Sequence, residues 1–402
     1  MFLLQKILSA IHEGTFSKRL YKYFFRRKKL YILYAPFALF HKINPKKVVF
    51  VNFGGKGFFD NPKYIAKKLH EFDSSWDFVW LVDFSHDCDL SEFPDYIKIV
   101  DMYSFSALHE YATAMFWIEN TRKNYFPLKK RCQYYIQTWH GGLGPKHSEA
   151  QVVRLLEKSY VSNAKKDSAL IDLCVSNTTL LTNLFRNYFW YSGEILKCGC
   201  PRNDIFFTGE EFAWVKEKIG CEKERICLYA PTFRNDYSLL HYGLDYTLLK
   251  SALEKRFGGE WGICIRLHPN FNTVVMTDLP ECVCNVTSYP DVQELLCVSD
   301  CVITDYSSLI YDFMLTKRPA FIFATDLERY IQHERGLNFT LDSTPFGMAQ
   351  TNEELYRNIT MFDNEVYVKG VEKFMATYEM NDDGHASERV VGWIIQKMGT
   401  IR

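Results

Sequence analysis

The sequence predicts an α/β protein with two parallel-sheet domains. Short apolar runs, which are typical of buried strands, alternate with segments of helical spacing along most of the 402 residues. A chain of this length usually folds around more than one hydrophobic core. Four of the apolar runs stop abruptly at small, hydroxylated or charged residues. Open parallel sheets bind their ligands beyond the carboxyl ends of the strands, so these runs also predict where a site lies.

The first half of the chain supplies the expected strands 48–53, 78–82, 97–100, 114–118, 134–136 and 173–176. Helical segments between them include 62–71, 104–111 and 151–160. The second half repeats the alternation, with expected strands near Ile226, Ile263, Val283, Val302 and Ala320. Two parallel sheets in succession are therefore expected.

We expect three regions: a basic and aromatic segment at 1–47, a first domain at 48–210 and a second domain at 211–402. The boundary between the domains is placed between Pro201 and Gly220, and the last helical segment, 390–398, could pack back on the first domain. The run that starts at Gly199 and reads Gly-Cys-Pro-Arg-Asn-Asp is interpreted as a turn, with a hinge or the wall of a cleft as the alternative.

Charge is distributed unevenly in a chain whose formal net charge is zero. Residues 1–47 hold eleven Lys and Arg against a single acidic residue, Glu13. Apolar and aromatic residues are interleaved with this charge, which favours a helix lying in the interface of an anionic membrane. The longest apolar run, 30–40, contains Pro36 and is too short to span a bilayer. A basic arm that binds a protein or nucleic acid is the alternative.

The segment Gln137-Thr138-Trp139-His140-Gly141-Gly142 follows one expected strand. Glycines allow a substrate to approach the backbone closely, and histidine has the side-chain pKa best suited to proton abstraction near neutral pH. A structural histidine after a strand is the alternative interpretation.

A second segment, Thr304-Asp305-Tyr306-Ser307-Ser308, follows the expected strand at 301–303. Helical spacing resumes at Leu309, so the two serines fall at a helix start, where free N–H groups and hydroxyls attract anions. Asp312 lies a little over one turn from Ser308 and can face the same pocket. A plain N-cap serine is the alternative.

Other expected strands also end in polar residues. Arg234, Arg266 and His268 follow the strands near 226 and 263, and they could supply positive charge for a diphosphate. Asn120 and Arg122 follow the strand at 114–118, where lining a cleft and capping a turn are equally open.

The cysteines and acidic residues predict neither a disulfide framework nor a metal centre. Several of the twelve cysteines fall inside expected strands, and the close pairs Cys198/Cys200 and Cys282/Cys284 lack the spacing of zinc ligands. We expect reduced thiols in a cytosolic protein. No cofactor is required by this sequence, although Mg²⁺ could accompany a diphosphate.

Taken together, these motifs resemble the CDP-glycerol glycerophosphotransferase family, whose members prime or polymerise teichoic acid and related alditol-phosphate polymers. The likeness covers residues 48–395, and its matching pieces are Trp139-His140-Gly141, Tyr229 to Arg234, Arg266-Leu267-His268, Ile303 to Ser308, Asp312-Phe313, Arg318-Pro319, Asp326 to Tyr330 and Arg335-Gly336. It implies a GT-B architecture, with two Rossmann-like domains facing a cleft, an acceptor side in the first domain and the CDP-alditol held mainly by the second.

The resemblance implies transfer of an alditol phosphate, glycerol phosphate first, from a CDP-alditol to a hydroxyl of a lipid-linked acceptor at the cytoplasmic face of the membrane. His140 and His268 are the catalytic candidates it implies. The substrate-binding candidates are Trp139, Gly141, Arg234, Arg266, Asp305, Ser307, Ser308, Asp312 and Glu328, with Asn120 and Arg122 on the acceptor side.

Two departures from the family pattern stand out. The family continues after Trp-His-Gly with Thr, Pro and a Lys pair, where this chain has residues 142–147, Gly-Leu-Gly-Pro-Lys-His. The long extra N-terminal region of many polymerising members is also lacking here, so single addition or a short product is one expectation, although length does not decide it. A GT-B glycosyltransferase using a nucleotide sugar, a non-catalytic membrane adaptor and a nucleic-acid binder are the competing functions.

Overall fold

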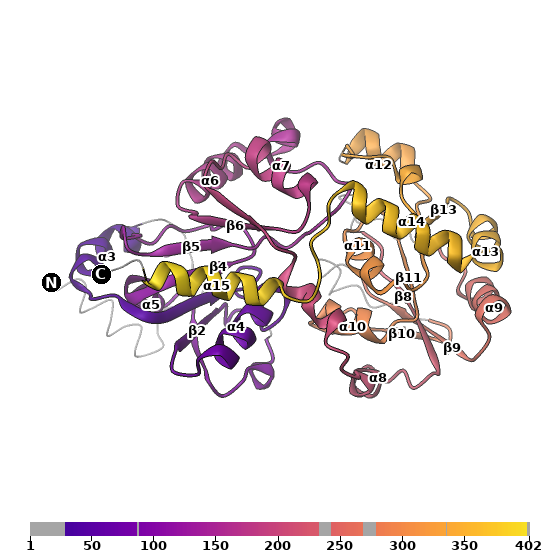
Figure 1. Ribbon diagram of the computed structural model, residues 1–402, viewed down its shortest axis with the longest axis horizontal. Helices are drawn as coiled ribbons and strands as arrows, with labels where there is room; N and C mark the ends of the chain where they lie inside the picture. Colours follow the sequence, from indigo (N-terminus) through magenta and orange to yellow (C-terminus); the bar gives the residue numbers. More distant parts are fainter. Residues whose placement is uncertain (1–28, 87, 233–242, 268–278, 335, 400–402) are drawn as a thin grey trace. The chain divides into compact units, whose positions relative to one another are not determined.

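The computed structural model describes residues 29–86, 88–232, 243–267, 279–334 and 336–399. Two parallel sheets form its framework (Figure 1). The first has seven strands in the order β3-β2-β1-β4-β5-β6-β7, and the second has six in the order β10-β9-β8-β11-β12-β13. These sheets confirm the expected fold class. The basic segment falls largely outside the described residues.

The strands of the first sheet are short and mostly buried, which explains their nearly continuous apolar sequences. They are β1 (Asn44–Val51), β2 (Asp77–Val82), β3 (Ile97–Asp101), β4 (Ala114–Glu119), β5 (Tyr134–Gln137), β6 (Leu173–Ser176) and β7 (Glu194–Lys197). Every residue of β4 is buried. The edge strand β7 was not predicted, because its four residues are exposed or half-buried and carry only two apolar side chains.

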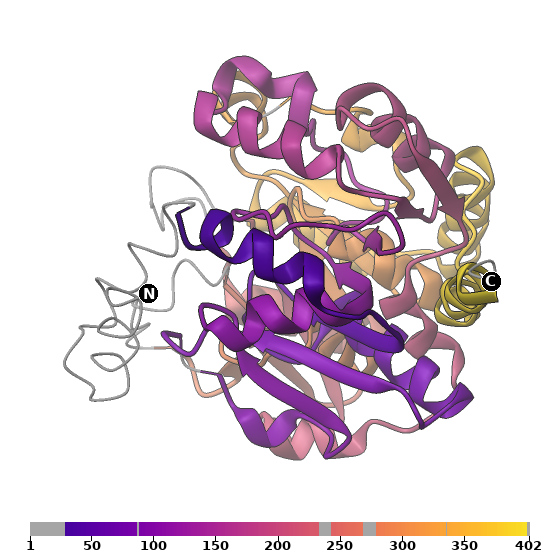
Figure 2. The same ribbon diagram turned by 90° about the vertical axis from the view of Figure 1, so that its left-hand side faces the viewer.

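Four α-helices lie in the connections between these parallel strands, namely α4 (Asp60–Phe72), α5 (Phe105–Thr113), α6 (Lys158–Ser168) and α7 (Thr179–Tyr188), and α3 (Lys29–Phe40) precedes β1. The Ser104 side chain caps α5 by accepting a hydrogen bond from the amide of Ala107. Helix α3 packs on α5 (Figure 2).

The prediction of one helix over 151–160 was wrong, because two separate elements occupy this part of the chain. A 3₁₀ segment, η2 (Glu149–Leu155), comes first, and α6 begins only at Lys158. Val152 has non-helical dihedral angles, φ −117° and ψ 24°, which break the helical path at that point.

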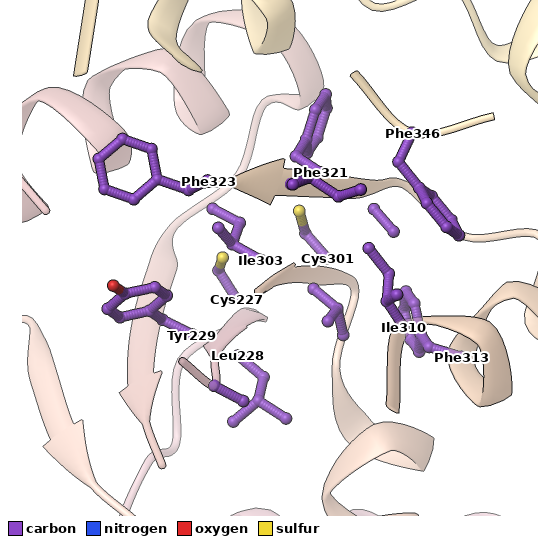
Figure 3. Packing of buried hydrophobic residues seen from close by; sticks show 14 of the residues in the cluster. Cys227, Leu228, Tyr229, Cys301, Ile303, Ile310, Phe313, Phe321, Phe323 and Phe346 are labelled. Atoms are coloured by element: carbon purple, nitrogen blue, oxygen red, sulfur yellow. The ribbon is translucent and has the colours of Figure 1, made fainter. Parts of the chain in front are cut away.

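The second sheet consists of β8 (Arg225–Tyr229), β9 (Trp261–Ile265), β10 (Val283–Asn285), β11 (Cys301–Thr304), β12 (Ala320–Phe323) and β13 (Gly347–Ala349). Its helices and 3₁₀ segments include η3 (Pro201–Phe207), α8 (Ala213–Lys218), α9 (Tyr246–Phe257), α10 (Val292–Val298), α11 (Leu309–Phe313), α12 (Leu327–His333), α13 (Asn352–Thr360) and α14 (Asn364–Thr377). The last helix, α15 (Ala386–Gly399), follows α14 in the chain. Figure 3 shows Ile310 and Phe313 of α11 beside the strand that carries Cys301, within the hydrophobic core.

The chain forms two compact units that interleave along the sequence. Unit 1 comprises 1–139, 158–174 and 391–402, and unit 2 comprises 140–157 and 175–390. In the sequence, the last strand of the first sheet, β7, and the first strand of the second, β8, lie on either side of the expected boundary at 201–220. The two compact units, however, are not divided at a single point such as residue 210, because each consists of several segments. Residues from Val391 onward cluster with unit 1, where Trp393 meets Tyr134 edge to face.

No helix in the described ranges has the length and apolar character needed to cross a bilayer.

Candidate active site

In unit 1, several candidate residues lie at the topological switch point between β1 and β4. Asn120, which follows β4, donates to Oδ1 of Asn52 at 2.6 Å and to Oδ1 of Asp60 at 3.2 Å. Its own side-chain oxygen accepts a hydrogen bond from the amide of Phe53 at 2.8 Å. Asn120 is fully buried. Its amide therefore fixes the loop after β1, and the expected role toward an acceptor stays a prediction.

Arg122 is half-buried, and its side chain is 6% exposed. Its Nη1 atom lies 3.2 Å from Oδ2 of Asp167 and 2.9 Å from the hydroxyl of Ser168. The guanidinium lies 5.6 Å from the ring centroid of Trp139, within cation–π distance. Burial raises the pKa of Asp167, an effect that the neighbouring Arg122 opposes. The structure thus places the Arg122 guanidinium against the Trp139 ring, and its expected role on the acceptor side stays a prediction.

Trp139 has a left-handed backbone, with φ +56°. Such a conformation costs a bulky residue about 1 kcal/mol or more, so it persists where the surroundings hold it. Its amide donates to Oε1 of Gln137 at 2.9 Å, and its carbonyl oxygen accepts from Nδ2 of Asn61 at 2.9 Å. Two buried side chains therefore hold the peptide groups at the end of β5, next to His140.

In unit 2, half-buried His140 is joined through its backbone to a buried ion pair. Nη1 of Arg202 donates to the His140 carbonyl oxygen at 2.7 Å. Nη2 of the same guanidinium lies 2.7 Å from Oδ2 of Asp312. Arg202 is 4% exposed and Asp312 is 1% exposed. The Asp312 carboxylate is therefore buried inside unit 2 and paired with Arg202, and its expected contact with an alditol stays a prediction.

The switch point of the second sheet lies between β8 and β11. There the hydroxyl of Thr304 donates to the carbonyl oxygen of Ala230 at 2.5 Å. The buried carboxylate of Asp305 accepts hydrogen bonds from the amides of Thr232, at 2.8 Å, and Tyr306, at 2.6 Å. Asp305 is thus occupied in tying the loop after β8 to the end of β11.

Ser307 and Ser308 are half-buried and precede α11, as expected. A Cβ built on Gly144 would lie 3.1 Å from Cβ of Ser308, so the loop after His140 passes close to this serine. Nζ of Lys146, on the same loop, lies 3.3 Å from the Thr232 hydroxyl. The structure therefore brings Lys146, Thr232 and Ser308 into one region of unit 2.

The remaining candidates lie in different surroundings. The Arg266 guanidinium donates to the carbonyl oxygens of Tyr289 and Val286, and burial lowers its pKa to about 10. Glu328 is exposed in the first turn of α12. That helix is anchored by Tyr330, whose ring stacks on Tyr306 with the centroids 3.8 Å apart. The expected diphosphate role of Arg266 and the expected nucleotide contact of Glu328 stay predictions.

Arg234, His268 and Arg335 lie outside the described residues. Among the residues that are described, no group of three or more His, Cys, Asp or Glu is arranged to hold a metal ion. Metal dependence and the absence of a required cofactor stay predictions.

Sequence reasoning missed the network around Asp312. Besides Arg202, the carboxylate accepts hydrogen bonds from Nδ2 of Asn203 at 3.1 Å and Nε2 of Gln293 at 3.2 Å. Arg202 and Asn203 belong to the run at 199–204 that was interpreted as a turn. The signal was that this polar run follows a strand, β7, which the sequence analysis did not recognise.

Comparison with known proteins assigns the family. A family model described as CDP-glycerol:poly(glycerophosphate) glycerophosphotransferase matches residues 33–396. The teichoic acid poly(glycerol phosphate) polymerase of Staphylococcus epidermidis is 30% identical over 88% of this chain, which spans 51% of that polymerase. The chain thus covers about half the length of that relative.

Other relatives match over nearly their full length. The teichoic acid glycerol-phosphate transferase of Staphylococcus aureus is 29% identical over 89% of this chain and 95% of its own. A solved structure of the wall teichoic acid polymerase TagF, from a crystal soaked with CDPG, superposes with a TM-score of 0.80 at 26% identity, covering 92% of this chain and 94% of that one. The chain therefore belongs to the CDP-glycerol:poly(glycerophosphate) glycerophosphotransferase family.

Proposed function

We propose that this protein transfers an alditol phosphate, glycerol phosphate first, from a CDP-alditol to a hydroxyl of a lipid-linked acceptor. The acceptor oxygen forms a new bond to the phosphorus that carries the alditol, the bond from that phosphorus to the bridging oxygen of the diphosphate breaks, and CMP leaves. Family membership supports this reaction, and the similar proteins are named as glycerol-phosphate polymerases and transferases and as ribitol-phosphate enzymes. A nucleotide-sugar glycosyltransferase is not favoured by these comparisons.

The observation that carries the proposal is the fixed backbone at His140. The carbonyl oxygen of this residue is held at 2.7 Å by a guanidinium that is itself paired with Asp312. A histidine on a held backbone can keep its imidazole in one place, as a general base requires. In the proposed reaction His140 takes the proton of the acceptor hydroxyl as the oxygen attacks phosphorus.

The diphosphate would be held at the carboxyl ends of β8 and β11. Ser307, Ser308 and Thr232 offer hydroxyls there, and Lys146 adds a positive charge. Arg234, Arg266 and His268 complete the donor site in this proposal, with Mg²⁺ as a possible companion of the diphosphate.

We place the protein at the cytoplasmic face of the membrane as a peripheral protein, bound through residues 1–47. The eleven basic residues of this segment would attract anionic lipid, with each charge near the surface contributing about 1 kcal/mol. This placement would bring the active site to a lipid-linked saccharide or polymer.

The decisive experiment measures CMP released from CDP-glycerol and from CDP-ribitol by the purified full chain with membrane lipid extract. His140→Ala is the control variant, and its folding is checked by thermal unfolding. Release from one donor that falls at least about 100-fold in the variant would support the proposal and name the alditol. No release from either donor by the folded wild-type protein would reject it.

A further inference from the structure

Arg202 and Asp312 form an ion pair that is almost fully shielded from solvent. Their side chains are 5% and 2% exposed, and the Nη2 to Oδ2 distance is 2.7 Å. Buried ion pairs of this kind contribute little net stability compared with apolar side chains of similar volume, because both charges lose their hydration. Stability alone therefore gives a weak reason for placing these two residues here.

The pair contacts the backbone of the candidate base. Nη1 of Arg202 donates to the carbonyl oxygen of His140 at 2.7 Å. A guanidinium is planar and its N–H groups point in fixed directions, so pairing with Asp312 also orients the donor aimed at His140. The next residues pack tightly as well: a Cβ on Gly142 would lie 2.8 Å from Nδ2 of Asn177 and 3.0 Å from Sγ of Cys200.

The same carboxylate connects this backbone to the loop and helix that begin beside the two serines. Asp312 lies in α11, which starts directly after Ser307 and Ser308. Asn203 donates to Oδ1 of Asp312 at 3.1 Å and to Oδ1 of Asp382 at 3.0 Å. One buried network thus holds both the His140 backbone and the helix that follows the serine pair.

We propose that Arg202, oriented by Asp312, is a positioning residue that fixes His140 relative to the start of α11. This inference rests on the proposed function, since it assigns His140 the role of general base. In this proposal, Arg202 acts on the reaction through the backbone of His140. Its loss should therefore lower kcat while leaving the KM for the CDP-alditol nearly unchanged.

The test compares Arg202→Met and Arg202→Lys with Arg318→Met. Arg318 is a suitable control because its guanidinium also donates to backbone carbonyl oxygens, those of Leu296 and Cys297 at 2.9 Å, at the end of α10. Steady-state CMP release and thermal unfolding are measured for each variant. We expect Arg202→Met to lose about 100-fold in kcat with KM within about threefold, and Arg318→Met to keep kcat at a comparable loss of stability.

Arg202→Lys covers the case in which the methionine variant fails to fold. A lysine keeps a charge beside Asp312 but cannot serve two partners with a fixed fork, so we expect an intermediate loss of kcat. Equal kcat in the Arg202 and Arg318 variants, or a raised KM with unchanged kcat, would overturn the proposal.

A second readout does not depend on turnover. In protein with ¹³C-labelled histidine, the NMR signal of His140, assigned by its absence from His140→Ala, should be single in the wild type and in Arg318→Met. It should broaden or split in Arg202→Lys. An unchanged signal there would refute positioning even if CMP is released, whereas a changed signal without CMP release in the wild type would reject the proposed function and leave the positioning role standing.

Discussion

The Nη1 atom of Arg202 lies 2.7 Å from the carbonyl oxygen of His140, so a residue 62 positions later in the chain holds the backbone of the candidate base. The contact joins two motifs that look independent in the sequence. It makes the fit of the loop after His140 a direct determinant of the proposed activity, and the first prediction concerns that fit.

Gly142→Ala should lower both stability and CMP release. The new Cβ would lie 2.8 Å from Nδ2 of the Asn177 side chain. Asn177 is fully buried, so its side chain cannot easily move aside. Overpacking of this kind costs about 1–3 kcal/mol and shifts the backbone two residues from His140. Thermal unfolding and the CMP assay together check this outcome.

The matched control is Gly392→Ala. Gly392 lies in α15, and an added Cβ meets no atom within 4 Å. Removing a helical glycine there should raise stability by about 0.5–1 kcal/mol without changing CMP release. Equal changes in stability and CMP release for Gly142→Ala and Gly392→Ala would contradict the tight packing at Gly142.

Asp382 should make stability depend on pH. Burial raises its pKa from 3.8 to about 6. Between these values the folded state binds more protons than the unfolded state, so this group's contribution to stability is full below pH 3.8 and is lost as pH rises to about 6.

Denaturant unfolding of the wild type and Asp382→Asn at pH 4.5 and pH 7 measures this effect, because pH 4.5 lies between the two pKa values of Asp382 and pH 7 lies about 1 unit above the folded-state value. On going from pH 4.5 to pH 7, the wild type should lose about 2 kcal/mol of stability relative to the variant. A difference between the two proteins that is the same at both pH values would contradict the raised pKa.

Arg122→Met should be strongly destabilising. It leaves the carboxylate of Asp167 buried without the guanidinium now 3.2 Å away, and breaking a buried pair from one side costs about 3–5 kcal/mol. Lys68→Met removes an exposed pair with Glu71 and should cost about 0.5 kcal/mol or less. Urea unfolding of both variants would decide the point, and similar losses would show that Arg122 is not committed to the interior of unit 1.

Asp305→Asn should reduce stability more than it changes KM. The Asp305 carboxylate accepts hydrogen bonds from the backbone amides of Thr232 and Tyr306. The neutral asparagine side chain should weaken these charge-assisted hydrogen bonds by about 1 kcal/mol. The KM for CDP-glycerol should stay within about threefold of the wild-type value. A tenfold rise in KM at unchanged stability would instead favour direct contact between Asp305 and the donor.

The apolar runs predicted the architecture because buried parallel strands have nearly continuous apolar sequences, as the fully buried β4 and β11 illustrate. The edge strand β7 was not predicted because two of its four residues are charged and none is buried, so its sequence lacks the apolar run of an interior strand. His140, Ser307 and Ser308 became site candidates because they lie shortly after the ends of β5 and β11.

The roles of the charged residues could not be predicted in the same way. The diphosphate role expected of Arg266 stays a prediction, but the hydrogen bond from its guanidinium to the carbonyl oxygen of Val286 could not be foreseen, because it depends on the path of a loop twenty residues later. Asp312 and Arg202 are likewise joined only by the fold. Whether a charged side chain turns inward or outward is decided by such distant partners, which local spacing does not encode.

The interleaving of the two compact units has a consequence for biosynthesis. Unit 1 is built from residues 1–139, 158–174 and 391–402, and the two segments of unit 2, 140–157 and 175–390, lie between them in the chain. During translation, therefore, the first unit cannot complete its packing until nearly the whole of the second has left the ribosome. A nascent chain arrested before residue 391 should expose the surface that Trp393 covers at Tyr134, and would be a natural substrate for chaperones.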